Sequence, residues 1–255
     1  QALKREGSRL DQIAVLYRET ERYEKAELRF REALDLVERG LGGDHLRVAQ
    51  SRLDLAELLR ARGRCEEAVA HYRRAAEIRE QALGPGHPDL AETLTYFARC
   101  LAITPSRRDA ARENLDAAIG ILGNSEAHSA VAVEALALRA DLAHGTDPAG
   151  GSRDLAEALR LVESMRPHRG GGEGVRAEFF GRYARLYERM VRWEVAAGHP
   201  DRALVAAERG RARALLDQLA AAHVGDTTPL PPEIESRQTA ARAELAEIRE
   251  RMNFE

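Results

Sequence analysis

The chain has 255 residues, of which 44% are hydrophobic but only 5% are aromatic. Charged residues make up 32% of it, and 42 acidic against 39 basic side chains give a formal net charge of −3. This composition is typical of close-packed helices rather than of a β-sandwich or barrel, and it gives no general positive field that would attract a nucleic acid. We therefore expect an all-α protein that does not bind nucleic acid.

The sequence lacks the marks of a membrane protein and of a metalloprotein. No stretch approaches the roughly 18 apolar residues of a membrane span, and no charged start is followed by an apolar signal core. The only cysteines, Cys65 and Cys100, lie in no CxxC pair and in no cluster with histidine, so neither a disulfide framework nor a zinc site is expected. We expect a cytoplasmic protein without a cofactor or metal.

A pattern that repeats every 42 residues occupies the first part of the chain. Segments that start at Ile13, Leu55 and Phe97 align without gaps, with large residues at equivalent positions. Small residues recur where two helices must approach closely; they are Ala14, Ala56 and Ala98, then Ala26, Ala68 and Ala110, then Ala33, Ala75 and Ala117. Each unit is therefore predicted to contain a helix, a short turn, a second helix and a longer connection.

This order of small and large residues resembles the tetratricopeptide repeat. The usual repeat has about 34 residues, whereas the unit here has 42. The connections LGGDHLRVA from Leu41 and LGPGHPDLA from Leu83 are similar to those of the kinesin-light-chain subtype. The resemblance implies an all-α superhelical solenoid of antiparallel helix pairs, with three in-phase units over residues 1–123.

Three histidines recur about one unit apart, at positions 45, 87 and 128. A regular series of this kind suggests a ladder of metal ligands, but one histidine per unit lacks the clustered ligands that a metal needs. We interpret them as turn residues, each placed just before a new helix.

The pattern weakens after residue 123. Residues 124–169 are predicted to form a degenerate fourth helix pair, with a loosened turn at the flexible TDPAGGS segment. Residues 170–224 hold a long helix, with most of the remaining aromatic rings, and then an arginine-rich closing helix. Residues 225–255 are predicted to be a Pro-rich linker and a C-terminal helix.

The arginine-rich helix carries a candidate docking face. Arg202, Arg209 and Arg213 are spaced so that they share one side of a helix, and Asp217 can pair with Arg213 four residues before it. A solvated, partly salt-bridged stripe is the default interpretation, and a docking face for an acidic partner is the alternative. Gly210 stands where earlier units have alanine, which predicts close helix packing at a cost of about 1 kcal/mol relative to alanine.

Residues 203–220, ALVAAERGRARALLDQLA, resemble the segment that closes the repeat array in bacterial proteins carrying a CHAT domain, a caspase-like protease. That resemblance implies a linker, a helix and then the protease, with its catalytic histidine and cysteine beyond Glu255. Cys65 and Cys100 lie in a repeat turn and in a first helix, away from any activating histidine, so we expect no catalytic residue in this chain. The start at Gln1 and the end without a helix stop signal also predict a piece of a longer protein.

A candidate binding groove follows from the repeat phase, which predicts an inner surface formed by the first helix of each unit. The residues placed there are Asp11, Val15, Arg18, Leu53, Glu57, Arg60, Thr95, Arg99 and Ala102. Arg18, Glu57, Arg60 and Arg99 are the candidates for partner binding, and the three arginines suit an acidic protein or peptide. A solvated face competes with this interpretation. The set lacks the Lys and Asn pattern with which some repeat proteins clamp a terminal carboxylate.

These features favour a non-catalytic repeat domain for protein–protein interaction and regulation. The leading hypothesis is the N-terminal sensor or scaffold of a CHAT-type protease, docked to the protease within the same molecule. The alternative is a free-standing scaffold, or the sensor arm of a transcriptional regulator.

Overall fold

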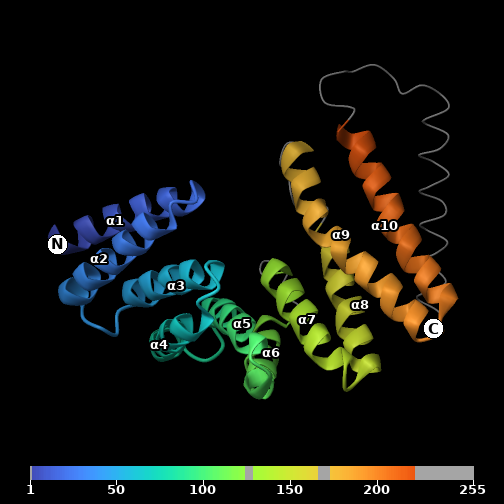
Figure 1. Ribbon diagram of the computed structural model, residues 1–255, viewed down its shortest axis with the longest axis horizontal. Coiled ribbons are helices and arrows are strands. Elements are labelled where there is room, and N and C mark those ends of the chain that lie inside the picture. Colours follow the sequence, from blue (N-terminus) through green and yellow to red (C-terminus); the bar gives the residue numbers. More distant parts are fainter. Residues whose placement is uncertain (1, 124–128, 166–172, 222–255) are drawn as a thin grey trace. The chain divides into compact units, whose positions relative to one another are not determined.

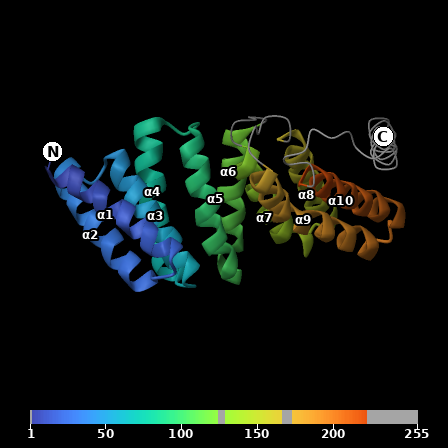
Figure 2. The same ribbon diagram turned by 90° about the horizontal axis from the view of Figure 1, so that it is seen from above.

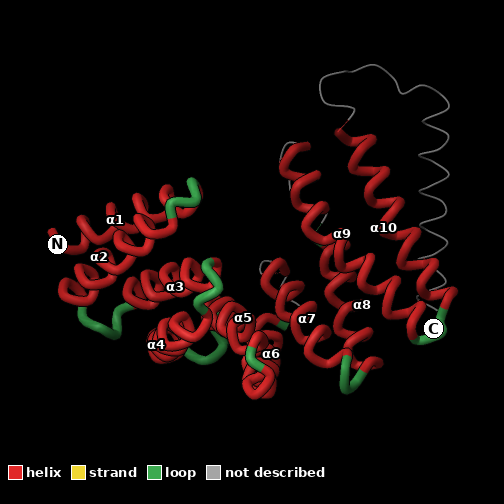
Figure 3. Tube along the Cα trace, viewed as in Figure 1, coloured by secondary structure: helices red, strands yellow, loops and turns green. Residues whose placement is uncertain are grey.

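The structure is a computed structural model, and it describes residues 2–123, 129–165 and 173–221. Every regular element in these ranges is a helix (Figure 3). The chain divides into two compact units, Gln1–Thr146 and Asp147–Glu255. Among the helices described, none is long and apolar enough to cross a membrane.

The first unit contains three antiparallel helix pairs and a further helix (Figures 1 and 2). Each pair packs on the next through its second helix, and the last helix contacts both members of the third pair. The pairs are α1 (Ala2–Glu19) with α2 (Tyr23–Leu41), α3 (Leu46–Ala61) with α4 (Cys65–Leu83), and α5 (Pro88–Ile103) with α6 (Arg108–Leu122), followed by α7 (Ser129–His144). The predicted all-α repeat fold is confirmed.

The recurring alanines fill the contacts between helices in the first two pairs. Ala14, Ala26, Ala33 and their counterparts 42 residues later are all 0% exposed. Each alanine buries little apolar surface area, but together they let the helix backbones approach closely. Larger side chains such as Phe30 and Tyr72 then interdigitate.

In the third pair the gapless alignment is wrong by one residue. The buried alanines of α6 are Ala111 and Ala118, both 0% exposed, rather than Ala110 and Ala117. The reason is the turn before α6, where a short 3₁₀ helix at Pro105–Arg107 delays the start of α6. One extra residue in the turn moves every later side chain by about 100° around the helix axis, so the buried stripe shifts by one position.

The outer side of α1 is open, whereas its equivalents are covered. Leu16 is 61% exposed, while Leu58 and Cys100, at the same repeat position, are 0% and 3% exposed. The difference arises because α3 packs on α2 and α5 packs on α4, the second helices of the preceding pairs. Burial at this position therefore depends on whether a preceding helix pair covers it, and not on the residue type alone.

Two of the recurring histidines lie just before a helix, as predicted, and the structure adds that their side chains cap those helices. The Nδ1 atom of His45 accepts a hydrogen bond of 3.0 Å from the backbone N–H of Arg47, and Nδ1 of His87 accepts one of 3.2 Å from Asp89. Each satisfies one of the N–H groups left free at the start of a helix. His128 lies outside the described residues, and no metal-binding cluster occurs among the residues that are described.

The second unit consists of α8 (Pro148–Ser164), α9 (Glu173–Ala196) and α10 (Pro200–Ala221). The α9 and α10 helices form an antiparallel pair, and α8 contacts α9, where the Tyr187 hydroxyl donates to Oε1 of Glu163 over 3.2 Å. The division after Thr146 separates α7 from α8, the two helices that the sequence pattern groups as a fourth pair. The predicted linker and helix of residues 225–255 lie outside the described residues.

Gly210 is a close-packing glycine, as predicted. A Cβ atom at this position would lie 3.2 Å from Cβ of Tyr187 and 3.4 Å from its Cγ. Because these atoms are near the Tyr187 backbone, they cannot swing away as the end of a long side chain does.

A valine at Gly210 is expected to lower the free energy of unfolding of the second unit by about 1–3 kcal/mol, because its side chain overpacks the α9–α10 contact. Gly120 in α6 is the matched control, since a Cβ there meets nothing within 4 Å. Gly120→Val should leave stability unchanged or slightly raised, because valine has a better helix propensity than glycine. Urea unfolding followed by circular dichroism measures both changes, and equal effects at the two positions would contradict close packing at Gly210.

Candidate partner-binding site

The candidate binding residues lie on the first helix of successive pairs and on α7. We call this the first-helix surface and define it by Asp11, Arg18, Asp54, Glu57, Arg60, Glu92, Tyr96, Arg99 and Glu134. The predicted residues Arg18, Glu57, Arg60 and Arg99 are all half-buried. Charges on different helices also influence each other: Arg18 and Glu92 act on the pKa of Asp54, and Glu57 and Arg60 act on that of Glu134. Charges on the first helices therefore act on one another and on Glu134 of α7.

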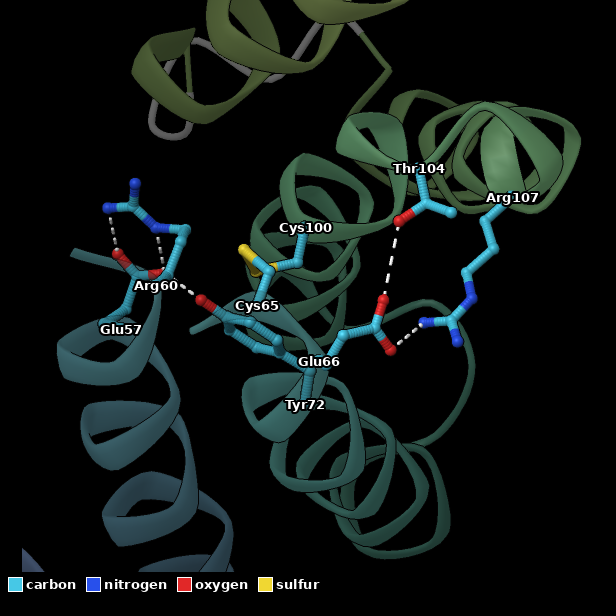
Figure 4. The surroundings of a disulfide bond; sticks show 8 residues. All are labelled: Glu57, Arg60, Cys65, Glu66, Tyr72, Cys100, Thr104 and Arg107. Carbon is cyan, nitrogen blue, oxygen red and sulfur yellow. Dashed lines mark hydrogen bonds and ion pairs between the residues drawn. A yellow bond between two sulfur atoms is a disulfide. The ribbon is translucent and has the colours of Figure 1, made fainter. Parts of the chain in front are cut away.

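Arg60 is held by a carboxylate from its own helix. Its Nε and Nη2 atoms donate to the two carboxylate oxygens of Glu57 over 3.1 and 2.9 Å, and the Tyr72 hydroxyl of α4 donates to the same carboxylate (Figure 4). Bidentate pairing of this kind fixes the guanidinium plane. The hydrogen bond to Glu57 raises the pKa of Arg60, and burial together with the Glu57 charge raises the pKa of Tyr72. The spacing of three residues between Glu57 and Arg60 on one helix is a sequence signal for such a pair, and the prediction from repeat phase did not use it.

Arg99 is held in a similar way, but across two helices. Its Nε lies 2.5 Å from Oε1 of Glu134 on α7, and its guanidinium carbon lies 5.5 Å from the centre of the Tyr96 ring, within the range of a cation–π contact. Burial raises the pKa of Glu134, and Arg99 opposes that shift. The pair therefore joins α5 to α7 and sets the charge of this part of the surface close to neutral.

Two carboxylates lie near the other end of the first-helix surface. Asp11 of α1 accepts a hydrogen bond of 3.3 Å from the Ser51 hydroxyl and lies 3.7 Å from Nη2 of Arg47. Burial and the charge of Asp54 nevertheless raise the pKa of Asp11 to about 6, from an ordinary 3.8. Burial also raises the pKa of Asp54, against the hydrogen bond from Gln50 and the charge of Arg18. Burial therefore outweighs the charges of Arg47 and Arg18, and the ionised form of both carboxylates is disfavoured.

The raised pKa of Asp11 predicts a specific dependence of stability on pH. The folded state holds the Asp11 proton more tightly than the unfolded state, so this group's contribution to stability is present below pH 4 and is lost as the pH rises towards 6. In Asp11→Asn this loss is absent. The unfolding free energy of the variant relative to the wild type should therefore rise by up to about 3 kcal/mol between pH 4 and pH 7.

Urea unfolding at several pH values between 4 and 7.5 measures that difference. Asp35→Asn is the control, because the Asp35 side chain is 62% exposed and the same negative charge is removed without relieving burial. A variant-minus-wild-type difference that stays constant with pH would contradict the raised pKa of Asp11.

Two of the residues predicted to line the groove are buried instead. Leu53 is 3% exposed and Thr95 is 0% exposed, and the Thr95 hydroxyl donates to the Ala91 carbonyl oxygen within its own helix over 2.8 Å. The expectation that they form an accessible lining is therefore wrong, because Leu53 belongs to the hydrophobic core and Thr95 is fully buried. Val15 and Ala102 are partly buried.

A buried arginine that the sequence pattern did not single out connects both helices of the second pair, α3 and α4, to α5 of the third pair. Arg79 of α4 is 4% exposed. Its Nη1 donates to the Asp89 carbonyl oxygen over 2.6 Å and to the Thr93 hydroxyl over 2.7 Å, and its Nη2 donates to Oε1 of Gln50 over 2.8 Å. Glu92 supplies the counter-charge at 3.3 Å. The position 42 residues earlier holds valine, so repeat phase gave no signal for it.

The second candidate site, on α10, is less uniform than its sequence spacing suggests. Arg202 is exposed, whereas Arg209 is half-buried. The side chain of Arg213 lies outside the described residues, as does that of Asp217, its predicted partner.

The expectation of two separate cysteines is wrong. Cys65, the first residue of α4, and Cys100 of α5 form a disulfide across 35 residues, with Cα atoms 5.1 Å apart (Figure 4). The pair was missed because neither cysteine belongs to a local motif, and only the packing of the third helix pair on the second brings them together. Neither sulfur is free to act as a nucleophile in this state.

Comparisons with known proteins agree with this architecture. Residues 8–81 and 53–123 match the tetratricopeptide repeat family model, and no curated protein matches the chain. The solved structure of BtubC (BKLC) from P. vanneervenii is similar, with a TM-score of 0.68, 16% identity and coverage of 90% of this chain and 85% of that chain. A Podosopora anserina putative kinesin light chain with nearly identical TPR-like repeats has a TM-score of 0.61, 18% identity and coverage of 86% and 99%. At these identities the structures establish the fold alone. Residues 8–123 are therefore tetratricopeptide repeats, in a chain that shares its fold with kinesin-light-chain-type repeat proteins.

Proposed function

We propose that this chain is a non-catalytic protein–protein interaction domain that binds a protein or peptide partner on its first-helix surface. Tetratricopeptide repeats generally serve as scaffolds for protein partners. The observation that carries the proposal is the pair of fixed, half-buried ion pairs, Glu57–Arg60 and Arg99–Glu134, on successive first helices and α7. Preorganised polar groups of this kind lose little side-chain entropy when a partner binds.

The first-helix surface offers charges of both signs to a partner. An acidic segment suits Arg18, Arg60 and Arg99, but it must compete with Glu57 and Glu134 for two of them. A basic side chain would instead meet Asp11 and Asp54, where a cation would favour the ionised carboxylates. The acidic partner remains our proposal for the Arg60–Arg99 part of the surface, and a basic group is the second candidate near Asp11.

Fluorescence anisotropy with two matched peptide libraries, one acidic and one basic, tests the binding surface. If the acidic proposal holds, acidic peptides should bind, and Arg60→Gln with Arg99→Gln should weaken them by about tenfold or more. Arg39→Gln is the matched control, because Arg39 lies on a second helix and is 65% exposed in a surface ion pair. Binding that is unchanged by the groove variants but lost on changing Asp11 would favour the basic alternative, and equal loss in the Arg39 control would indicate a non-specific charge effect.

We further propose that the chain is the N-terminal sensor or scaffold of a CHAT-type protease. The support is the resemblance of residues 203–220 together with the close-packed glycine of α10 that this segment contains. Docking of the protease on the Arg202 and Arg209 face of α10 is part of the proposal, as is a cytoplasmic location. The alternative is a free-standing scaffold or the sensor arm of a transcriptional regulator.

Reading the parent gene downstream of codon 255 separates these possibilities. A strand-rich module with spaced histidine and cysteine supports the protease, a DNA-binding helix-turn-helix supports a regulator, and an immediate stop supports a scaffold. The chain itself should not cleave peptide substrates. Cleavage that persists in a Cys65→Ser, Cys100→Ser variant would contradict an accessory role for this domain.

A further inference from the structure

We propose that Cys65 and Cys100 form a thiol–disulfide exchange site whose redox state controls how firmly the second helix pair is held to the third. The reactant is a dithiol reductant in one direction and a small disulfide, such as oxidised glutathione, in the other. The bridge covalently joins α4 to α5, and both of the sequence's cysteines take part.

The disulfide lies at the start of α4, at the end of the α4–α5 interface where the other interactions are weak. Glu66, next to Cys65, pairs with Arg107 at 2.9 Å and accepts a 3.5 Å hydrogen bond from Thr104 (Figure 4). The Glu66 and Arg107 side chains are 67% and 40% exposed, so water and salt screen this pair strongly. Opening the disulfide therefore removes the strongest tie at the start of α4.

The opposite end of α4 and the middle of the interface stay attached without the bridge. Arg79 donates its buried hydrogen bonds to α5 near the end of α4, and the rings of Tyr72 and Phe97 stack with their centres 6.1 Å apart. Reduction is therefore expected to loosen one end of the contact without unfolding the repeats.

The preceding interface shows the same positions without a covalent bond. Tyr23 and Leu58 stand 42 residues before Cys65 and Cys100. Tyr23 is the first residue of α2, as Cys65 is of α4, and Leu58 is fully buried on α3. The repeat architecture thus holds these two positions without a covalent bond, as the reduced form of the second interface requires.

The exchange proceeds through two attacks on sulfur. One thiolate of the dithiol attacks a sulfur of the bridge, the Cys65–Cys100 bond breaks, and the released cysteine takes up a proton. The second thiol of the reductant then attacks the mixed disulfide, closes its own S–S bond and releases the other cysteine, which is also protonated. Two electrons and two protons pass from the dithiol to the cysteines. Both residues are less than 9% exposed, so the reaction requires a local opening of the α4–α5 contact.

The test compares the full 255-residue chain after treatment with oxidised glutathione and after treatment with dithiothreitol. Each form is alkylated, and its intact mass is measured by mass spectrometry. Oxidised protein should take up no alkyl group and reduced protein two. Hydrogen–deuterium exchange at the start of α4, the end of α5 and the following turn should become about tenfold faster on reduction. The start of α2 and the middle of α3 serve as the internal control and should not change. Re-oxidation should restore slow exchange.

A Cys65→Ser, Cys100→Ser variant separates redox control from other effects of the reagents. It should behave like the reduced form in both buffers, with a thermal midpoint several degrees below that of the oxidised protein. The proposal is overturned if oxidised glutathione forms no intramolecular bridge, or if the bridge forms and exchange in α4 and α5 is the same in both states.

Discussion

Replacing Leu58 with alanine should lower the free energy of unfolding of the first unit by about 2–5 kcal/mol, whereas Leu16→Ala should change it by no more than about 0.5 kcal/mol. The two leucines occupy the same position in their repeats, yet Leu58 is 0% exposed and Leu16 is 61% exposed. Truncating Leu58 removes buried methyl groups from the hydrophobic core that α2, α3 and α4 share and leaves a cavity there. Truncating Leu16 removes a side chain that is already largely in water.

Urea unfolding monitored by circular dichroism measures both variants under the same conditions. Because the chemical change is identical, differences in helix propensity cancel between them. Similar losses at the two positions would show that α1 is covered in solution by something other than its own pair. A small loss at Leu58 would contradict the tight contact between the first and second pairs.

Replacing Arg79 with methionine should cost about 2–4 kcal/mol, because it leaves acceptors of α3 and α5 without their donor in a buried place. Methionine keeps most of the aliphatic volume, so the effect reports on the hydrogen bonds rather than on a cavity. The acceptors affected are the Gln50 side chain, the Asp89 carbonyl oxygen and the Thr93 hydroxyl oxygen. Arg79→Lys should be intermediate, since one ammonium group cannot reproduce the planar arrangement of donors.

Arg39→Met on α2 is the matched control for this prediction. Arg39 pairs with Asp35 at 3.2 Å, with the two side chains 65% and 62% exposed, and such surface pairs contribute little. The expected change is within about 0.5 kcal/mol. If Arg79→Met were as mild as the control, the polar contacts of Arg79 would not hold the second pair to the third, and the role assigned to that end of α4 in the redox proposal would fail with it.

The fold was predictable because small and large residues recur at fixed positions in each repeat. Alanines at fixed intervals identify where helix backbones approach, and the histidines before α3 and α5 mark where helices begin. The prediction of the buried alanines failed at α6. The turn before α6 has a different length, which shifts the buried positions by one residue, and alanines occupy both the predicted and the observed positions. Both Ala110 and Ala111 are present in the sequence, so composition alone could not decide which of them is buried.

The chemistry of the candidate site was much less predictable. Repeat phase predicted one surface for Glu57 and Arg60 but took no account of the ion pair that their three-residue spacing on one helix allows. Arg99 is paired with Glu134, from a part of the chain where the repeat pattern had already weakened. The disulfide and Arg79 connect successive helix pairs, and the equivalent positions in the preceding repeat hold other residue types. A method based on recurrence therefore overlooks both.

The disulfide also changes how this molecule would respond to tension. Its cysteines are separated by 35 positions in the sequence, and an extended chain reaches at most about 3.3–3.6 Å per residue. A chain pulled from its two ends would therefore release about 120 Å less length while the bridge is intact, because the segment from α4 to α5 would stay looped. Reduction would add that length to the maximum extension of the unfolded chain, so the redox state of two residues would set how far the chain extends under force.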